Sequence, residues 1–346
     1  MQIPKHILVI RFSAMGDVAM TVPVIKNVLQ QNPELRITVV SNAFLQPLFE
    51  NIDRCNFYPA HLKGIHKGIK GIYQLVKELK SLYKFDAIAD LHNVLRSSLI
   101  KFFFTLSSVK ITTLDKGRQQ KKELTRKNNK ILKPLTSMHE RYAEVFRRLG
   151  LSIKLNNDNP VFGKQIFPST LQDIFSTEKK IIGIAPFAQH EEKMYPLSKM
   201  KQVVQQLAAQ NSTVLLFGGG KNETETLQQW ADNIEGVHNM AGKFSLKEEL
   251  AIISNIDIMV SMDSANMHLA SLFGIKVISV WGATHPYAGF NGWAQKSENI
   301  VQVDLFCRPC SVFGNKPCYR GDNACMNMIS EEMIITKILE GHTHSS

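Results

Sequence analysis

The chain has 346 residues, 44% hydrophobic and 21% charged, which is the balance of a globular protein and excludes a disordered chain. At this length two domains are expected, and the formal net charge of +11 favours anionic partners. No apolar run approaches the roughly 18 residues of a membrane-spanning helix, and no signal-peptide cleavage site precedes the first apolar run. A cytoplasmic location is therefore expected.

Apolar, β-rich runs alternate with helix-like stretches through the first half of the chain. Strands are predicted at His6–Phe12, Arg36–Ser41, Asp86–Asp90 and Val109–Leu114. Helices are predicted at Asp17–Gln31, Gly71–Tyr83, Asn93–Thr105 and Ser137–Leu149, the last stopping at Gly150. Because the strand runs are almost continuously apolar, they indicate parallel strands buried on both faces of a doubly wound sheet.

A polar, turn-rich stretch at residues 156–169 predicts an interdomain linker, after which the alternation starts again. Strands are predicted at Lys180–Ala185, Thr213–Gly218, Asp257–Ser261 and Lys276–Trp281. Helices are predicted at Leu197–Gln210, Asn222–Asn233, Leu246–Ser254, Ser264–Phe273 and Glu331–Glu340. The prediction is an α/β protein of two Rossmann-like doubly wound domains, residues 1–160 and 161–346, facing a central cleft. The last helix, about residues 331–340, could pack back on the first domain.

The turn after the first strand has the sharpest local pattern. Arg11, Ser13, Gly16 and Asp17 follow the apolar run, with Pro23 six residues further on. No G-x-G-x-x-G or phosphate-loop lysine is present, so a dinucleotide fingerprint is not indicated. From the residues alone, Asp17 is either a helix N-cap or a functional carboxylate at a strand end.

This turn resembles the opening signature of glycosyltransferase family 9, the bacterial heptosyltransferases, and the resemblance extends over essentially the whole chain. It implies the two-domain GT-B architecture, with acceptor on the first domain and nucleotide-sugar donor on the second. The family's aspartate corresponds to Asp17, which the resemblance makes the general base of an inverting sugar transfer, with Ser13 and Gly16 beside the acceptor. Gly16 can take a positive φ and lets a substrate approach the backbone.

Three loops of the second half resemble the family's donor-binding elements. In the first, Lys193 would offset charge on the departing diphosphate and Gln189 would donate a hydrogen bond beside it. In the second, Gly218–Gly220 form a close turn, and the resemblance makes Glu223 an acceptor for the ribose hydroxyls. A solvated loop lysine and an ordinary glycine turn are the structural alternatives.

The third loop joins a buried strand to a helix that Ser264 would cap. The amides of the first helical turn form an anion site, so a diphosphate placed there needs no metal. The resemblance assigns donor contacts to the following positions: Asp263, Ser264, Ala265, His268 and, after the next strand, Thr284. Ala265 departs from the family's usual glycine. A histidine on a helix can equally be structural.

Candidate acceptor contacts come from two further places. Arg96 follows a strand end that resembles the family's acceptor-side element and could pair with a phosphate or carboxylate. Lys121 and Lys122 belong to a basic stretch, residues 116–133, which carries one acid, Glu123, among many lysines and arginines. Such a stretch favours a phosphorylated glycan, an acidic lipid surface or a nucleic acid, or is simply a solvated loop.

Four of the five cysteines lie close together at Cys307, Cys310, Cys318 and Cys325, a spacing that also fits zinc. In a cytosolic protein buried thiols are the alternative, and Arg308, Lys316 and Arg320 between them could border the cleft. No metal or other cofactor is expected.

The leading hypothesis is transfer of a heptose or related sugar, from a nucleotide donor expected to be ADP-linked, to a cell-envelope glycan or lipopolysaccharide core acceptor. A peripheral contact with the inner membrane would bring the enzyme to an anionic glycolipid. Two alternatives stay open. The protein could be a basic nucleic-acid binder, although aromatic residues for base stacking are missing from the basic stretch, or a sugar-nucleotide binder without catalysis.

Overall fold

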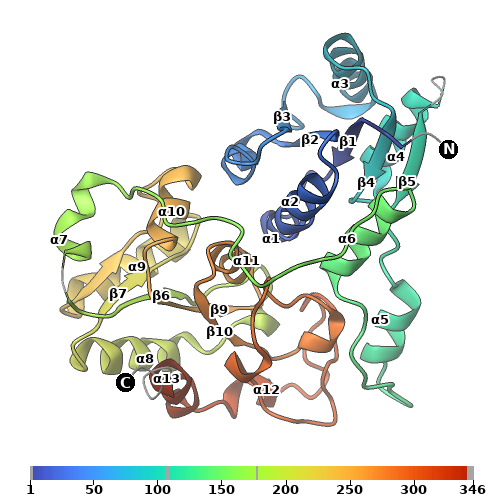
Figure 1. Ribbon diagram of the computed structural model, residues 1–346. Coiled ribbons are helices and arrows are strands. Elements are labelled where there is room, and N and C mark those ends of the chain that lie inside the picture. The colour runs from blue at the N-terminus through green and yellow to red at the C-terminus, as the bar shows by residue number, and fades with distance from the viewer. Residues whose placement is uncertain (1–2, 106–108, 177, 341–346) are drawn as a thin grey trace. The chain divides into compact units, whose positions relative to one another are not determined.

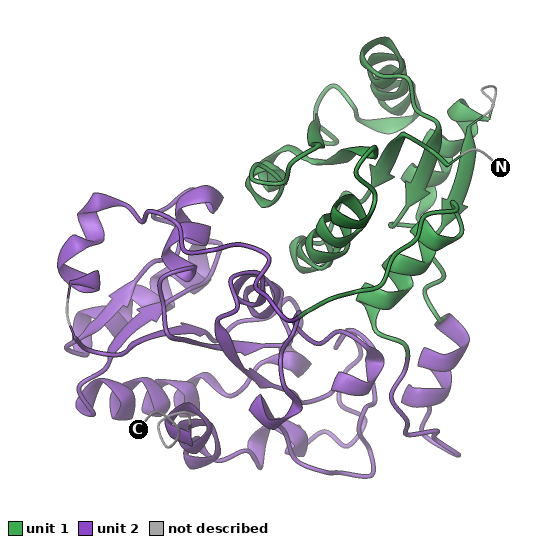
Figure 2. Cartoon of the chain, viewed as in Figure 1, with its two compact units in different colours: residues 1–117, 136–157 green, residues 118–135, 158–346 purple. Residues whose placement is uncertain are grey.

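A computed structural model describes residues 3–105, 109–176 and 178–340 (Figure 1). The chain divides into two compact units, each an α/β fold around its own parallel sheet (Figure 2). Unit 1 comprises residues 1–117 and 136–157, and unit 2 comprises residues 118–135 and 158–346. The predicted pair of Rossmann-like domains is confirmed.

The sheet of unit 1 has strand order β3-β2-β1-β4-β5, with every neighbouring pair parallel. The central strand reads HILVI and is fully buried beyond its first residue, as expected for a strand covered on both faces. The strands are β1 (His6–Ile10), β2 (Arg36–Asn42), β3 (Cys55–Ala60), β4 (Ala87–Asp90) and β5 (Lys110–Thr113).

Helices cover both faces of this sheet. Alternate strand residues such as Leu8, Ile10 and Ile88 join one core with the apolar faces of α3 (Gly68–Leu82) and α4 (Leu95–Phe104). On the other face, α2 (Thr21–Gln31) packs against α6 (Met138–Arg147), and the short α1 (Met15–Ala19) precedes α2.

The sheet of unit 2 has strand order β11-β10-β9-β6-β7-β8, again with parallel neighbours. Its strands are β6 (Ile181–Ala185), β7 (Thr213–Leu216), β8 (Val237–Asn239), β9 (Ile258–Met262), β10 (Lys276–Val280) and β11 (Ile300–Val301). The larger helices are α8 (Leu197–Ala209), α9 (Lys221–Asn233), α10 (Leu246–Ile253), α11 (Ala265–Leu272) and α13 (Glu331–Leu339), and the short ones are α7 (Gln172–Phe175) and α12 (Ala324–Asn327). Helices α8, α9 and α13 share one core with the sheet, and α10 packs against α11.

Two segments are placed differently from the prediction. The basic stretch, predicted to belong to the first domain, belongs to unit 2 from Arg118 onward, where residues Arg118–Thr125 form helix α5 with Lys121 and Leu124 buried. Helix α13 contacts α8, β10 and β11 of unit 2, because Ile334, Ile335 and Ile338 supply an apolar face to that core. The chain passes between the units at residues 117/118, 135/136 and 157/158, and the last of these points lies within the predicted linker.

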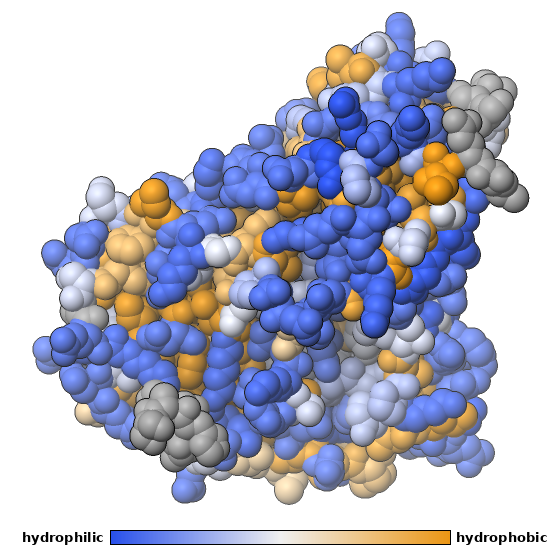
Figure 3. Space-filling view, in the orientation of Figure 1, coloured by the Kyte–Doolittle hydropathy of each residue, from blue (hydrophilic) through white to orange (hydrophobic). Residues whose placement is uncertain are grey.

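Each sheet has one point where successive connections reverse direction: between β1 and β4 in unit 1, and between β6 and β9 in unit 2. Ligands of open α/β sheets bind outside the carboxyl ends of the strands at such points. The face seen in Figure 3 is largely hydrophilic with smaller hydrophobic groups. Within the described ranges, no helix is both long and apolar enough to cross a bilayer.

Candidate functional site

The connections after β1 and β4, together with helix α6, bring four side chains together in unit 1. We call them the Asp17 cluster: Arg11, Asp17, His92 and Tyr142. Nη2 of Arg11 lies 2.5 Å from Oδ2 of Asp17, and Nη1 donates to the carbonyl of Leu91 at 2.8 Å. The guanidinium also lies 5.9 Å from the ring centroid of Tyr142. One buried arginine therefore ties the Asp17 carboxylate to the end of β4.

Asp17 is the third residue of α1, and the N-cap position belongs to Ala14. Its carboxylate accepts the Ala14 amide at 3.3 Å. The interpretation of Asp17 as the N-cap residue is therefore wrong, because the N-cap lies three residues earlier in the chain. Gly16 lies inside the helix and does not adopt the positive φ that is open to a glycine. The carboxylate remains 30% exposed, which leaves it reachable by a hydroxyl of a bound molecule.

His92 is held neutral beside the carboxylate. Burial, together with the charges of Arg11 and Lys116, lowers the pKa of His92 to about 4. Its Nδ1 accepts the amide of Phe12 at 3.4 Å, which leaves the proton on Nε2 as a hydrogen-bond donor. Burial likewise raises the pKa of the Tyr142 hydroxyl, so this residue stays protonated.

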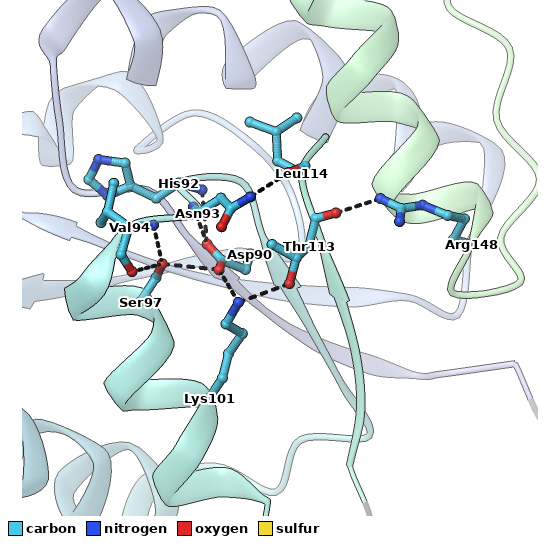
Figure 4. A network of polar contacts seen from close by, with 9 residues as sticks. All are labelled: Asp90, His92, Asn93, Val94, Ser97, Lys101, Thr113, Leu114 and Arg148. Atoms are coloured by element: carbon cyan, nitrogen blue, oxygen red, sulfur yellow. Dashed lines mark hydrogen bonds and ion pairs between the residues drawn. The ribbon is translucent and has the colours of Figure 1, made fainter. Parts of the chain in front are cut away.

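The turn after β4 is fixed by Asp90, which is fully buried (Figure 4). Its Oδ1 accepts the amides of His92 and Asn93 at 3.0 and 2.8 Å. Its Oδ2 accepts the Ser97 hydroxyl at 3.0 Å and pairs with Nζ of Lys101 at 2.7 Å. Both oxygens of the carboxylate thus have partners within the protein. Asp90 therefore acts as a scaffold that holds His92 in place.

In unit 2 the central contact joins Lys193 and Asp263. Their Nζ and Oδ2 atoms lie 3.1 Å apart, and both side chains are largely buried. Lys193 ends the short 3₁₀ helix η3 (Glu191–Lys193) in the loop after β6, and Asp263 directly follows β9. The two strands flank the reversal point of this sheet, so the two loops meet at its edge.

The start of α11 lies beside that pair. Ser264 occupies the N-cap position, and its Oγ lies 3.1 Å from Oγ of Ser261 without capping an amide of its own helix. The amides of the first turn therefore have no side-chain cap, which suits an anion. His268 is buried in the second turn.

Two polar atoms near this sheet edge are buried without a hydrogen-bond partner among the described residues: Oγ1 of Thr284, which follows β10, and Oδ1 of Asn266 in α11. Buried polar groups normally find partners, so a ligand or water is expected to supply them here. Asn266 was not among the predicted contacts.

The glycine-rich turn after β7 closes on itself. Gly220 caps α9 with a φ of +83°, and Oε2 of Glu223 accepts the Gly219 amide at 2.8 Å. Glu223 therefore holds this turn through one oxygen, whatever it contacts through the other. Gln189 is exposed in the loop that leads to Lys193.

The other predicted contacts divide between the units. Ser13 is exposed in the β1–α1 turn, and Arg96 is exposed in the first turn of α4. Lys121 lies in unit 2, with its Nζ 4.3 Å from the ring centroid of Phe290, and Lys122 is exposed next to it. The assignment of these two lysines to the first domain is therefore wrong.

The cysteine-rich segment holds a buried arginine rather than a recognisable metal site. All four cysteines are free thiols, and no three His, Cys, Asp or Glu residues in the described part of the chain are arranged to hold a metal. Arg308, expected at a cleft border, is buried instead and donates to the carbonyls of Gly282, Trp281 and Thr284. It shapes the loop that carries Thr284.

Sequence reasoning missed His92 and Tyr142, although His92 lies in a run that was singled out for Arg96. A polar run directly after a buried strand was the available signal for His92. No local signal marks Tyr142, because only the packing of α6 brings it to Arg11.

Comparison with known proteins points to the same family that the sequence resembles. A family model described as glycosyltransferase family 9 (heptosyltransferase) matches residues 72–317. A lipooligosaccharide heptosyltransferase 2 of Campylobacter jejuni is 28% identical over 199 residues. That match covers 56% of this chain and 57% of the relative. The chain thus spans little more than half of the relative's length.

Two solved structures resemble the fold over nearly all of the chain. A family 9 glycosyltransferase from Veillonella parvula superimposes with a TM-score of 0.74 at 20% identity, covering 97% of this chain and 98% of that one. The ADP-heptose lipopolysaccharide heptosyltransferase II of Escherichia coli superimposes with a TM-score of 0.68 at 17% identity, with the same coverage. Both unit folds and their order along the chain are thus those of GT-B-type heptosyltransferases.

Proposed function

The chain belongs to glycosyltransferase family 9, the heptosyltransferases, and we propose that it transfers a heptose or related sugar from an ADP-linked donor to the core of a lipopolysaccharide-type acceptor. The acceptor is an anionic glycolipid, so the enzyme would work at the inner face of the cytoplasmic membrane through a peripheral contact. The Lys193–Asp263 pair beside the uncapped start of α11 is the observation that carries the proposal.

The donor side is argued from charge. A nucleoside diphosphate leaving group carries negative charge that grows as the glycosidic bond breaks. The α11 amides and the Lys193 ammonium supply positive potential where that diphosphate would lie, and Asp263 orients the ammonium. The hydroxyl of Thr284 provides a further buried donor. This arrangement supports departure of the diphosphate without a metal ion.

The acceptor side is argued from the Asp17 cluster. In the proposed step, the acceptor oxygen forms a bond to the anomeric carbon, and the bond from that carbon to the diphosphate oxygen breaks. The electron pair leaves with ADP, and the acceptor's proton passes to the Asp17 carboxylate. A single displacement inverts the anomeric configuration. The neutral His92 offers a hydrogen bond beside the carboxylate without competing for that proton.

Two alternatives are weighed against this function. Nucleic-acid binding was suggested by the basic stretch, but membership of a sugar-transferring family gives that stretch no such role. A silent sugar-nucleotide binder would share the donor site and differ only in turnover. The exposed and oriented Asp17 carboxylate favours catalysis.

The test is a transfer assay with a panel of nucleotide sugars and a heptose-deficient lipopolysaccharide core acceptor. Thermal stabilisation of the protein first ranks the donors, because a specific ligand raises the melting temperature by mass action. ADP-heptose is expected to stabilise the protein most and to give a product longer by one sugar. Stabilisation without any product would support the silent binder, and stabilisation only by nucleic acid would refute the proposal.

A further inference from the structure

The outer face of α3 and α4 in unit 1 has an unusual combination of side chains. Five large apolar residues are 56–79% exposed there, on these helices and the loop before α3: Ile65, Ile69, Tyr73, Leu95 and Phe102. In Figure 3, hydrophobic and hydrophilic residues stand side by side over α3, at the top of the view. Exposed apolar side chains gathered on one face commonly mark an interaction surface.

The two helices present these residues together. On α3, Ile69 and Tyr73 are one turn apart, and Lys77 continues the same stripe, while Ile72, Val76 and their neighbours face the core. On α4, Leu95 and Phe102 are two turns apart on one side. The rings of Tyr73 and Phe103 lie 5.3 Å apart, and those of Phe102 and Phe103 lie 5.6 Å apart, so the two stripes adjoin.

Positive charge surrounds these apolar residues. Residues 61–84 contain six lysines and a single acid, Glu78. The Glu78 carboxylate is occupied by the Tyr58 hydroxyl at 2.6 Å, by His66 at 2.9 Å and by Gln74 at 2.8 Å. It therefore does not neutralise the lysines, all six of which are exposed: Lys63, Lys67, Lys70, Lys77, Lys80 and Lys84.

We propose that this face, the α3–α4 face, docks on the surface of an anionic phospholipid bilayer. Apolar side chains on one helix stripe, flanked by ammonium groups, match a membrane interface, where the former enter the acyl boundary and the latter meet lipid phosphates. A protein partner fits less well, because lysine is depleted at protein–protein interfaces. The proposal extends the proposed function, since it would bring unit 1 to a lipid-anchored acceptor.

The binding test needs no sugar donor. The full chain is mixed with vesicles of phosphatidylethanolamine and phosphatidylglycerol, or of phosphatidylcholine alone, and the bound fraction is measured by sedimentation. Binding to the anionic vesicles is expected, weakening steeply as salt rises. Absence of binding to anionic vesicles at low salt would overturn the proposal.

Paired variants separate the two contributions. The K70Q/K77Q variant should weaken binding to anionic vesicles by about fivefold for each charge removed. The I69S/Y73S variant should lose the binding that persists at high salt. Controls on unit 2 are K221Q/K243Q, which removes two exposed lysines, and I166S, which replaces one exposed isoleucine. If the controls lose as much binding as the α3–α4 variants, another surface is responsible.

A second readout keeps this proposal distinct from sugar transfer. With a detergent-dispersed acceptor, both α3–α4 variants should retain wild-type turnover, because no residue changed belongs to the Asp17 cluster or the Lys193 loop. Vesicle binding by a protein without turnover would refute the proposed function and leave the docking surface standing. If the same variants instead abolish self-association of the chain and leave vesicle binding intact, the face is a protein interface.

Discussion

Oδ2 of Asp17 lies 2.5 Å from Nη2 of Arg11, and this pair, together with the Ala14 amide at the helix start, sets the direction of the carboxylate. Arg11 also holds the carbonyl of Leu91, so the candidate base is linked to the neighbouring strand end of the same sheet. A carboxylate that must accept a proton at a defined place benefits from such a fixed position.

Replacing Asp17 by Asn should abolish transfer while the donor still binds. An amide is similar in shape but cannot take the proton, and general-base catalysis contributes on the order of 10²–10⁴ in rate. The check is kcat by product formation beside donor affinity by calorimetry. Asp53→Asn, at an exposed aspartate of the same unit, is the control and should behave as wild type. Normal turnover by Asp17→Asn would exclude Asp17 as the base.

Arg11→Lys should lower kcat by roughly 10- to 100-fold with little change in donor KM, because lysine keeps the charge but cannot bridge Leu91 and Asp17 together. A positioning residue acts only through the group it positions. In an Asp17→Asn background the Arg11→Lys change should therefore have almost no further effect on rate. Additive losses in the double variant would show that Arg11 acts independently of Asp17.

The stability of the protein should depend on His92 between pH 6.5 and about 4. In the unfolded chain a histidine gains its proton near pH 6.5, whereas burial beside Arg11 and Lys116 lowers the folded pKa of His92 to about 4. As pH falls, the unfolded state binds this proton first. The contribution of neutral His92 to the free energy of unfolding is therefore fully present above pH 6.5 and is lost as pH falls toward 4.

His92→Gln removes this linkage. Relative to wild type, the variant should gain about 2 kcal/mol on going from pH 7 to pH 4.5, a figure reduced to allow for the partial exposure of the ring. Urea unfolding at the two pH values measures the difference. If the unfolding free energies of His92→Gln and wild type differ by the same amount at both pH values, His92 titrates normally in the folded protein.

Lys193→Met should destabilise unit 2 by about 3–5 kcal/mol, because it leaves the Asp263 carboxylate buried without its cation. Adding Asp263→Asn should restore most of that loss. Donor affinity should not recover in the double variant, since the ammonium that faces the diphosphate is still missing. Recovery of both stability and affinity together would assign the pair a purely structural role.

Asp90→Ala should cost about 3–5 kcal/mol in unfolding free energy, because two amides, a hydroxyl and the Lys101 ammonium lose their acceptor. Lys101→Met alone should also destabilise the protein. The two changes combined should cost clearly less than their sum, because they remove the same contact. Thermal or urea unfolding of the three variants tests this, and simple additivity would contradict the network drawn in Figure 4.

The success of the fold prediction follows sheet position. Strands with neighbours on both sides were predicted from nearly continuous apolar runs, as in HILVI of β1. The strands β3, β8 and β11 were missed, and all three are edge strands; the remaining edge strand, β5, was predicted. An edge strand is short or only partly covered, as the half-buried CNFYPA of β3 illustrates, so its sequence carries a weaker pattern.

The site was predicted in part for a similar reason. Residues in the connections that follow buried strands, such as Asp17, Lys193 and Asp263, could be picked out because strand ends of one sheet meet at one edge. The residues that bond to them could not be predicted from the sequence. The basic stretch looked like a charged loop of the first domain, and only packing against Phe290 shows that Lys121 belongs to unit 2.

By itself, the sequence determined the two parallel sheets and the loops that carry their chemistry, because apolar periodicity and strand-end polarity are local properties of the chain. Only the tertiary structure decided that Arg11 holds Asp17, that Asp90 holds the turn of His92, and that Lys193 meets Asp263. Arg11 and Asp17 are close in sequence, but Arg11 is fixed by the carbonyl of Leu91, 80 residues further on, and Lys193 and Asp263 come from different loops. Such pairing depends on how whole strands and helices pack, which no single stretch of sequence records.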